Sequence, residues 1–319
     1  MPVPAGQPVI AVLAGDDRPD GLAEHAEVRL AGADDLPAAL DGADVLLVWD
    51  FLSPAVPAAW RAADTSAVRW VHTASAGVDK VTFPELQAHP AEITNARGVF
   101  DRPIAEYVAG VVLAFAKDLP GTLRLQARGE WRHRETSTVR GRHAVVVGSG
   151  PIGRAIADLL GAIGLRTSLV GRRAADGVHA FSSLPELLPS ADVLVLAAPL
   201  TDATRGMLDR VSLGLLPGNA LVVNVGRGGL VVEPDLVAAL REGRIAGAAL
   251  DVFEIEPLPA ASPLWGMDNV IVSPHMSGDV AGWRGMLRDQ FLENLARYRA
   301  GEPLHNVVDK TLGYVKGTS

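Results

Sequence analysis

A series of short apolar runs, rich in valine, leucine and alanine, fills the second half of the sequence and limits the folds that it can adopt. The runs begin at Ala144 with AVVVG and continue as TSLVG, DVLVLAAP, ALVVNVG, AGAALDVF and NVIVSPH. They lack regular alternation of apolar and polar residues, which is typical of parallel strands buried on both faces. Stretches of helical periodicity separate them, at 152–163, 184–188 and 233–241 among others. Strands connected by helices predict a doubly wound, parallel α/β domain.

A shorter series of the same kind occupies the first hundred residues. Strand-like runs are found at 9–15, 44–49 and 68–75, and a helical segment is found near 36–40. This pattern predicts a second, smaller parallel α/β unit, and a length of 319 residues agrees with about two domains. Two long helices are also expected, one from Pro103 to about Gln126 and one from Gly282 to Ala300 that ends at Gly301.

Composition and charge exclude several classes of function. The net charge of −8 is spread without long runs of one sign, so no basic surface is offered to nucleic acid or to a membrane. Cysteine is absent, which excludes disulfides, thiolate metal sites and a cysteine nucleophile, and no metal site is predicted. The longest apolar stretch, 108–116, is far shorter than the roughly 20 residues of a membrane span, and the first residues lack the basic region of a signal peptide. We therefore expect a globular, cytoplasmic protein that binds small molecules.

A glycine-rich turn follows the first strand of the longer series. Gly148, Gly150 and Gly153 form G-x-G-x-x-G between this strand and a helix that opens with Pro151 and Ile152. Glycine allows a tight turn and a close approach of the backbone to a pyrophosphate, and the start of a helix offers free N–H groups to the anion. The loop is predicted to bind a dinucleotide; the alternative is a glycine-rich turn that binds nothing.

The end of the next strand bears on the choice between NAD and NADP. Enzymes that use NAD carry an acidic residue about 20 residues beyond the glycine loop, which binds the ribose hydroxyls. Here that strand ends in Gly171-Arg172-Arg173, so the carboxylate is missing and two guanidinium groups stand in its neighbourhood. Because arginine suits a phosphate, we predict a preference for NADP(H), with NAD(H) use possible. The alternative is a pair of solvated surface arginines.

Three chemically active side chains follow later strands of the series. Arg227 stands between glycines, Glu256 follows the next strand, and His275 follows the last. Ligands of open α/β sheets bind outside the carboxyl ends of the strands, so all three are expected near one crevice. Hydride delivery to a ketone needs a proton donor, and an unperturbed imidazole, with a pKa of about 6.5, suits this role. Taken singly, each residue also has an ordinary structural explanation.

Together these residues resemble the D-isomer-specific 2-hydroxyacid dehydrogenases, and the resemblance covers essentially the whole chain. The matching stretches are TASAGVD (73–79), VVVGSGPIGRAIA (145–157), LAAPLTDATRGML (196–208), VNVGRGGLVVEPDLVAALREGRIAGAALDVFEIEPLP (223–259) and VSPH (272–275). In pattern the chain is most similar to the glyoxylate/hydroxypyruvate reductases, which share the Gly-Arg ending of the second strand and the use of NADPH. Departures are Val225-Gly226 before Arg227, and Met276 after His275.

The resemblance implies two Rossmann-like domains with parallel sheets: a flavodoxin-like substrate domain of residues 1–100 and 285–319, and a dinucleotide-binding domain of residues 101–284. It implies reduction of small 2-keto acids to D-2-hydroxy acids by a homodimer, with Arg227, Glu256 and His275 as the catalytic residues. It further implies that the loop of Ser75, Ala76, Gly77 and Val78 binds the substrate carboxylate, and that Pro199, Thr204, Asn224, Val225, Gly226 and Asp251 lie against the cofactor.

The substrate pocket and the class of function leave alternatives open. Trp49 and Trp283 are candidates to shape the pocket, although a packing role is equally compatible with their positions. Some relatives of this fold act as corepressors that sense a dinucleotide, and others oxidise formate or phosphite. The complete set of Arg227, Glu256 and His275 favours an enzyme over a corepressor. A formate-type activity ranks lower, because the formate enzymes pair their histidine with glutamine whereas the partner here is Glu256.

Overall fold

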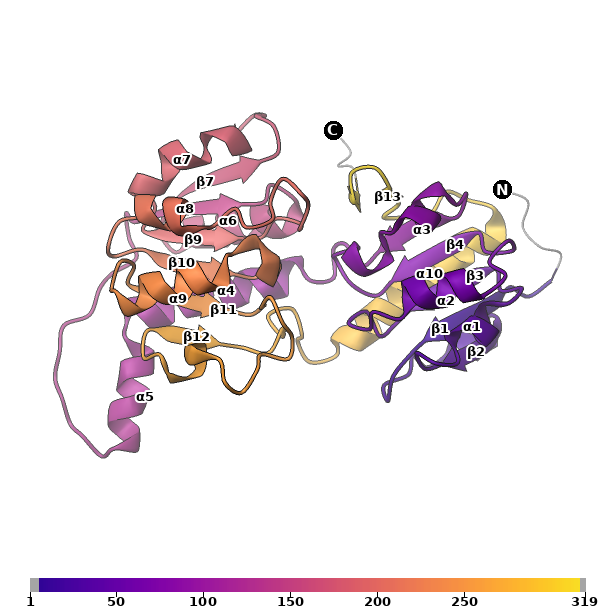
Figure 1. Ribbon diagram of the computed structural model, residues 1–319, viewed down its shortest axis with the longest axis horizontal. Helices are drawn as coiled ribbons and strands as arrows, with labels where there is room; N and C mark the ends of the chain where they lie inside the picture. The colour runs from indigo at the N-terminus through magenta and orange to yellow at the C-terminus, as the bar shows by residue number, and fades with distance from the viewer. Residues whose placement is uncertain (1–5, 316–319) are drawn as a thin grey trace. The chain divides into compact units, whose positions relative to one another are not determined.

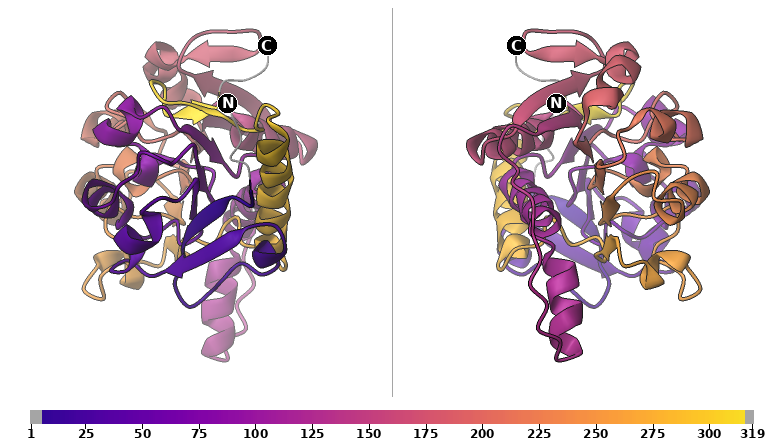
Figure 2. Two further views of the ribbon diagram at one scale, coloured as in Figure 1. Left: turned by 90° about the vertical axis from the view of Figure 1, so that its right-hand side faces the viewer. Right: turned by 90° about the vertical axis from the view of Figure 1, so that its left-hand side faces the viewer.

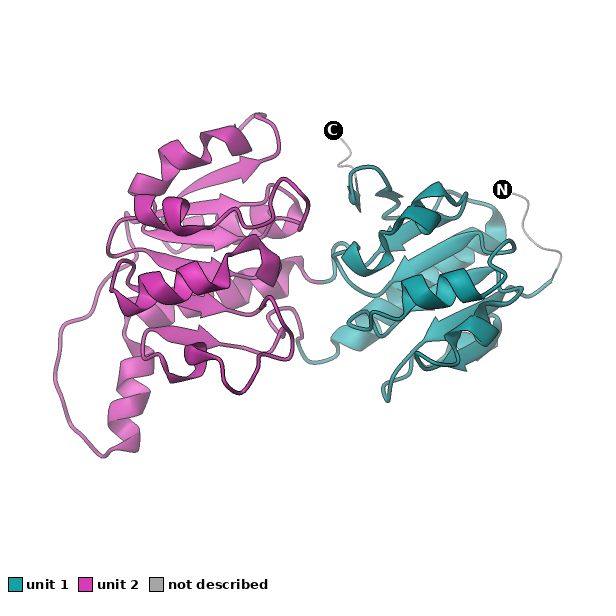
Figure 3. Ribbon diagram, viewed as in Figure 1, with its two compact units in different colours: residues 1–99, 280–319 teal, residues 100–279 magenta. Residues whose placement is uncertain are grey.

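The computed structural model describes residues 6–315 and divides the chain into two compact units. Unit 1 consists of Met1–Val99 together with Val280–Ser319, and unit 2 of Phe100–Asp279 (Figure 3). The chain therefore leaves unit 1 once and returns to it, which makes unit 1 discontinuous.

Unit 1 contains a five-stranded sheet in the order β2-β1-β3-β4-β5, and all of its strand pairs are parallel. This order is the flavodoxin-like one, which confirms the predicted fold class. The strands are β1 (Val9–Leu13), β2 (Glu27–Ala31), β3 (Val45–Val48), β4 (Trp70–Thr73) and β5 (Glu92–Asn95). A short antiparallel ribbon, β13 (Val308–Asp309) with β14 (Tyr314–Val315), follows near the end of the described chain.

Helices cover both faces of this sheet (Figure 1). In the described part of unit 1 these helices are α1 (Leu36–Leu40), α2 (Val56–Ala62), α3 (Pro84–Ala88) and α10 (Trp283–Ala300). Side chains alternate along β4: Val71 joins the apolar cluster of α1 and α2, whereas Trp70 stacks on Phe291 of α10 at a centroid distance of 4.9 Å. α10 ends where Gly301 adopts a left-handed conformation, as the sequence predicted.

Unit 2 contains a seven-stranded parallel sheet in the order β12-β11-β10-β9-β6-β7-β8. Its strands are β6 (His143–Val147), β7 (Arg166–Gly171), β8 (Val178–Ala180), β9 (Val193–Leu196), β10 (Leu221–Asn224), β11 (Gly247–Leu250) and β12 (Val270–Val272). The direction of winding reverses between β6 and β9, which is the switch point where doubly wound sheets bind their ligands. Besides the helices before β6, which are described next, unit 2 contains α6 (Pro151–Ala162), α7 (Leu184–Leu187), α8 (Arg210–Leu215) and α9 (Glu233–Arg241).

The prediction of one helix from Pro103 to about Gln126 is wrong in one respect, because this stretch forms two helices. α4 spans Asp101–Ala116 and α5 spans Leu119–Ala127. Asp118 breaks the run with a left-handed φ of 45°, and its carboxylate accepts a hydrogen bond from the Gly121 amide at 3.1 Å, which caps the second helix. Figure 2 shows α5 projecting away from the sheet of unit 2.

The described residues contain neither a helix suited to span a membrane nor a cluster of metal-ligating side chains. No helix between residues 6 and 315 combines the length and the apolar character that crossing a membrane requires. Within the same range, no three histidine, aspartate or glutamate side chains gather in a way that could hold a metal ion.

Candidate active site

The glycine loop joins β6 to α6 and each of its glycines meets a different requirement. Gly148 has a φ of 126°, and a Cβ there would stand 2.5 Å from the Ala197 carbonyl oxygen. A Cβ on Gly153 would overlap the carbonyl of Gly148, so this glycine lets α6 pack against the turn. Gly150 faces open space, and no side chain caps the N-terminus of α6 at Pro151 and Ile152. An open cradle beneath free helix N–H groups fits the pyrophosphate of a dinucleotide.

The end of β7 lies beside this loop, because the Gly148 amide donates to the Val170 carbonyl at 2.8 Å. Gly171 is buried at the end of the strand, and Arg172 and Arg173 are exposed immediately after it. A carboxylate at this position is absent, as the sequence indicated.

The Arg227 loop is fixed from both sides. The Asn224 side chain donates to the Arg227 carbonyl at 3.0 Å and accepts from the Gly226 amide at 3.1 Å. Gly226 is buried, with a notional Cβ only 2.8 Å from Leu230, and Gly228 packs directly on the backbone of Phe253. The half-buried Arg227 thus stands on a rigid loop that contacts the segment carrying Glu256.

Glu256 and His275 come from different loops and form a direct pair. The Nδ1 of His275 lies 2.8 Å from Oε2 of Glu256, and the two side chains are 27% and 30% exposed. The other oxygen of Glu256 accepts the Phe253 amide at 2.9 Å. Burial by itself would raise the pKa of the Glu256 carboxyl, but the hydrogen bonds from His275 and Phe253, with the charge of Arg227, lower it below its ordinary value. An ionised Glu256 accepts from Nδ1–H, which leaves Nε2 of the ring for other partners.

The loop that carries His275 is held by a network that sequence reasoning missed. Asp251 is fully buried and accepts hydrogen bonds from the Ser273 hydroxyl at 2.6 Å and from the Met276 and Ser277 amides at 2.9 and 3.0 Å. Tyr107, on α4, lies 2.6 Å from the Ser273 oxygen; because Ser273 donates to Asp251, the Tyr107 hydroxyl must be the donor. Burial raises the pKa of Tyr107, so it keeps its proton.

The oxygens of Asp251 are thus occupied by this loop, whereas the resemblance implies a contact with the cofactor, which stays a prediction. Only the Ser in VSPH hints at the network, and Tyr107 has no sequence signal because it is 166 positions away from Ser273.

The other residues expected near the cofactor follow β9 and β10. Thr204 accepts from the Thr201 amide at 2.9 Å and donates to the Pro199 carbonyl at 2.7 Å, so its hydroxyl closes the loop after β9. Pro199 is exposed, and Val225 is buried beneath the Arg227 loop. Their contact with a cofactor remains a prediction.

In unit 1, a loop of small residues follows β4. Its carbonyl groups are bonded within the unit: the Ala76 carbonyl accepts from the Asn95 side chain at 2.6 Å, and the Gly77 carbonyl from the Ser75 hydroxyl at 2.6 Å. Among residues 6–315, the N–H groups of Ser75, Ala76 and Gly77 have no acceptor. Successive free amides of this kind suit a carboxylate.

Both tryptophans proposed for the pocket are engaged within unit 1. Trp49 is only 7% exposed, and its indole N–H donates to Asp17 at 2.8 Å. Trp283 packs edge-on against Phe51 at a centroid distance of 6.1 Å. These contacts account for Trp49 and Trp283 by packing, and a contact of either with substrate stays a prediction.

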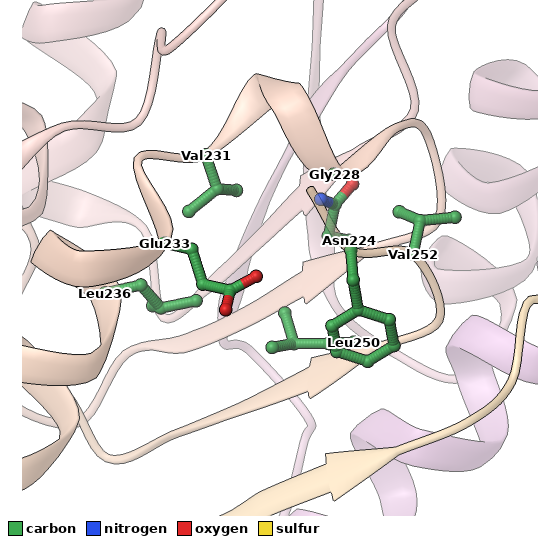
Figure 4. A pocket seen from close by; sticks show the side chains of 8 residues that line it. Asn224, Gly228, Val231, Glu233, Leu236, Leu250 and Val252 are labelled. Carbon is green, nitrogen blue, oxygen red and sulfur yellow. The ribbon is translucent and has the colours of Figure 1, made fainter. Parts of the chain in front are cut away.

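A small, mostly apolar pocket lies beside the Arg227 loop (Figure 4). The Glu233 carboxylate is directed into it from the start of α9. Its other lining residues are Asn224, Gly228, Val231, Leu236, Leu250, Val252 and Phe253. None of the three predicted catalytic side chains lines it, so it is not the site of the chemistry.

The chain is similar in sequence to known proteins. Residues 109–277 match the family model of the D-isomer specific 2-hydroxyacid dehydrogenase, NAD binding domain. Glyoxylate/hydroxypyruvate reductase A HPR2 of Arabidopsis thaliana is 32% identical over 73% of this chain and 76% of its own length.

Solved structures agree over almost the whole chain. A D-isomer specific 2-hydroxyacid dehydrogenase of Xanthobacter autotrophicus, in complex with NADPH and MES, has a TM-score of 0.81 at 32% identity and covers 97% of this chain and 100% of its own. The NADPH-dependent glyoxylate/hydroxypyruvate reductase of Sinorhizobium meliloti, in complex with NADP and sulfate, has a TM-score of 0.80 at 27% identity and covers 96% and 99%.

The glycine cradle fits a nicotinamide dinucleotide, the family model covers more than half of the chain, and a relative above 30% identity covers more than two thirds of it. The chain therefore belongs to the D-isomer specific 2-hydroxyacid dehydrogenases, oxidoreductases that act on CH–OH groups.

Proposed function

We propose that the protein reduces small 2-keto acids of the glyoxylate and hydroxypyruvate type to D-2-hydroxy acids, with NADPH as the preferred cofactor. The observation that carries the proposal is the 2.8 Å pair of Glu256 and His275, with Arg227 near enough to lower the pKa of Glu256. An acid–base group beside a fixed cation is what hydride transfer to a keto acid requires.

The reaction adds a hydride to C2 of the keto acid and a proton to its carbonyl oxygen. NADPH, when bound, supplies the hydride. His275 supplies the proton from Nε2, because its Nδ1 is occupied by Glu256. Glu256 fixes the orientation of the ring through this hydrogen bond. In the reverse direction the same nitrogen removes the proton from the hydroxyl.

Each unit, taken by itself, offers donors that suit the substrate carboxylate. Arg227 offers a rigidly held guanidinium, which also polarises the carbonyl oxygen. In unit 1, Ala76 and Gly77 offer free backbone N–H groups. The carbonyl groups of the same two residues already accept hydrogen bonds within the unit. Positioning of this kind explains why an acidic protein can retain an anionic substrate.

A preference for NADPH rests on the end of β7. Arg172 and Arg173 are exposed there and no carboxylate stands in their place. The structural relatives from Xanthobacter autotrophicus and Sinorhizobium meliloti were solved with NADPH and NADP, which supports the same preference here.

A substrate panel tests the proposal. Purified protein is assayed with glyoxylate, hydroxypyruvate, pyruvate and formate, each with NADPH or NADP and with NADH or NAD. We expect turnover of the two-carbon and three-carbon keto acids, with NADPH giving the higher kcat/KM. Tight binding of NADPH without turnover of any acid would favour a sensor of the corepressor type, and oxidation of formate would favour a formate dehydrogenase.

We also infer that the protein forms a homodimer through α5 and the loop that follows it. Leu119 and Leu123 of α5 are 49% and 63% exposed, and Trp131 in the loop is fully exposed. Large apolar side chains gathered on a projecting segment are typical of an interface between chains.

A further inference from the structure

The glycine loop and the end of β7 meet at Gly171, and the space between them is filled. Gly171 has an ordinary φ, so its backbone does not require glycine. A Cβ at this position would overlap the Ser149 hydroxyl oxygen and would stand 2.9 Å from Val178 and 3.1 Å from the Ser149 Cβ. The constraint is therefore steric, and it comes from the side chains of Ser149 and Val178.

Position 171 is the place from which an acidic side chain would reach the adenosine ribose, since it ends the second strand of the dinucleotide-binding sheet. The Ser149 side chain occupies part of the volume that the Cβ of such a residue would need. The absence of an acidic residue at position 171 and the presence of Ser149 therefore belong to one packing arrangement.

The Ser149 hydroxyl is itself available for a ligand. The residue is half-buried between the exposed Gly150 and the buried Gly148, and among residues 6–315 its hydroxyl has no hydrogen-bond partner. Arg172 follows Gly171 directly, is exposed, and forms no ion pair with another described residue. A hydroxyl donor and a guanidinium at one strand end suit a phosphate rather than a ribose hydroxyl.

We propose that Ser149 determines the cofactor specificity of this enzyme: its side chain excludes the ribose-binding carboxylate from position 171, and its hydroxyl joins Arg172 in binding the 2′-phosphate. This inference rests on the NADPH preference proposed above. It adds that Ser149 and Gly171 act as a coupled pair, so that changing Gly171 alone does not convert the enzyme to NADH.

Binding of two fragments that differ only in the 2′-phosphate tests the proposal without reference to turnover. Dissociation constants of adenosine 2′,5′-bisphosphate and of 5′-AMP are measured by calorimetry for the full chain. Ser149→Ala is expected to weaken binding of the bisphosphate about tenfold, the effect of losing one charge-assisted hydrogen bond, and to leave 5′-AMP unchanged. Ser182→Ala, at an exposed serine after β8, is the control.

The steric part is tested with Gly171→Asp, alone and combined with Ser149→Gly. The single variant is expected to weaken both fragments and to gain no affinity for NADH, whereas the double variant gains NADH affinity at least tenfold over the single one. Arg172→Ala is compared with Arg166→Ala, which removes the same charge at the opposite end of β7. Thermal unfolding shows which variants fold; if Gly171→Asp does not, Ser149→Ala and the double variant still decide.

The outcomes separate the two proposals. Equal affinity of the unaltered protein for both fragments would overturn the NADPH preference and this inference with it. A clear preference for the bisphosphate that Ser149→Ala leaves intact would overturn the role of the Ser149 hydroxyl alone. Conversion to NADH by Gly171→Asp without a change at Ser149 would overturn the steric role.

Discussion

His275 holds a backbone conformation that few side chains adopt, with a φ of 53°. Such a conformation costs on the order of 1–3 kcal/mol and persists only where the surroundings impose it. Here the His275 amide donates a hydrogen bond to the Asp251 carbonyl at 2.8 Å. The amides of the next two residues, Met276 and Ser277, donate to the Asp251 carboxylate. The imidazole is thus aimed by its backbone as well as by Glu256.

The role of His275 predicts a large loss of turnover on its removal. His275→Ala is expected to lower kcat for glyoxylate by about 100- to 10,000-fold, the usual contribution of general acid catalysis. The affinity for NADPH, measured by fluorescence titration, should stay within about twofold.

The control is His305→Ala, which removes a half-exposed histidine paired with Glu293 at 3.2 Å in unit 1. If both variants lost activity to the same extent, the assignment of His275 as the proton donor would be wrong.

A second histidine predicts how stability depends on pH. His72 is fully buried in unit 1, where burial lowers its pKa from 6.5 to about 3. Below pH 6.5 His72 binds a proton in the unfolded chain but stays neutral in the folded chain. The free energy of unfolding therefore falls as the pH decreases. Between pH 7 and pH 5 the loss from this residue amounts to about 2 kcal/mol.

His72→Phe keeps an aromatic ring beside Phe291 but removes the titrating group. Urea unfolding is monitored by hydrogen exchange in peptides of unit 1. The free energy of unfolding is expected to depend less on pH in the variant than in the unaltered protein. An unchanged slope between pH 7 and pH 5 would show that His72 is not the group responsible.

At the level of helices and strands, the apolar runs predicted the two parallel sheets because both faces of each sheet are covered. α9 begins and ends at Glu233 and Arg241, the residues that periodicity indicated. The break between α4 and α5 was missed because it depends on one left-handed residue, Asp118, whose carboxylate is also held by Arg134 at 2.5 Å. The contact of Arg134 with Asp118 joins residues 16 positions apart, so it leaves no periodic signal.

The contact between α4 and the loop after β12 predicts a positioning effect. Tyr107→Phe removes only the hydroxyl that donates to Ser273, so we expect a several-fold fall in kcat, an unchanged KM for NADPH, and a stability loss of about 1 kcal/mol in unit 2. Tyr314→Phe makes the same chemical change in unit 1 and should leave kcat, KM and the stability of unit 2 unchanged. Steady-state kinetics and urea unfolding measure both effects, and a kcat equal to that of the control would contradict the role of Tyr107.

At the scale of the whole molecule, the sequence predicted the three candidate catalytic residues more readily than the groups that support them. Arg227, Glu256 and His275 each follow a strand of one sheet, so the order of the motifs alone predicts that they meet. The Tyr107 network and the Ser149–Gly171 packing join residues from separate elements, and only three-dimensional packing brings them together.

The exposed apolar side chains of α5 predict association of two chains. Leu123→Asp places a charge on this segment and is expected to convert a dimer to a monomer in light scattering after gel filtration. Leu52→Asp, at a leucine in unit 1 that is 54% exposed, should leave the mass unchanged. A monomeric mass for the unaltered protein would remove the basis of the dimer proposal.

The discontinuous course of unit 1 has a consequence for synthesis. Phe291 and the rest of α10 cover one face of a sheet whose strands all lie before residue 100. As the nascent chain leaves the ribosome, that sheet therefore waits with Trp70 uncovered while the whole of unit 2 is made, since domains fold as their residues emerge. Unit 2, which is continuous, can fold first, and its glycine cradle exists before the rest of the enzyme is complete.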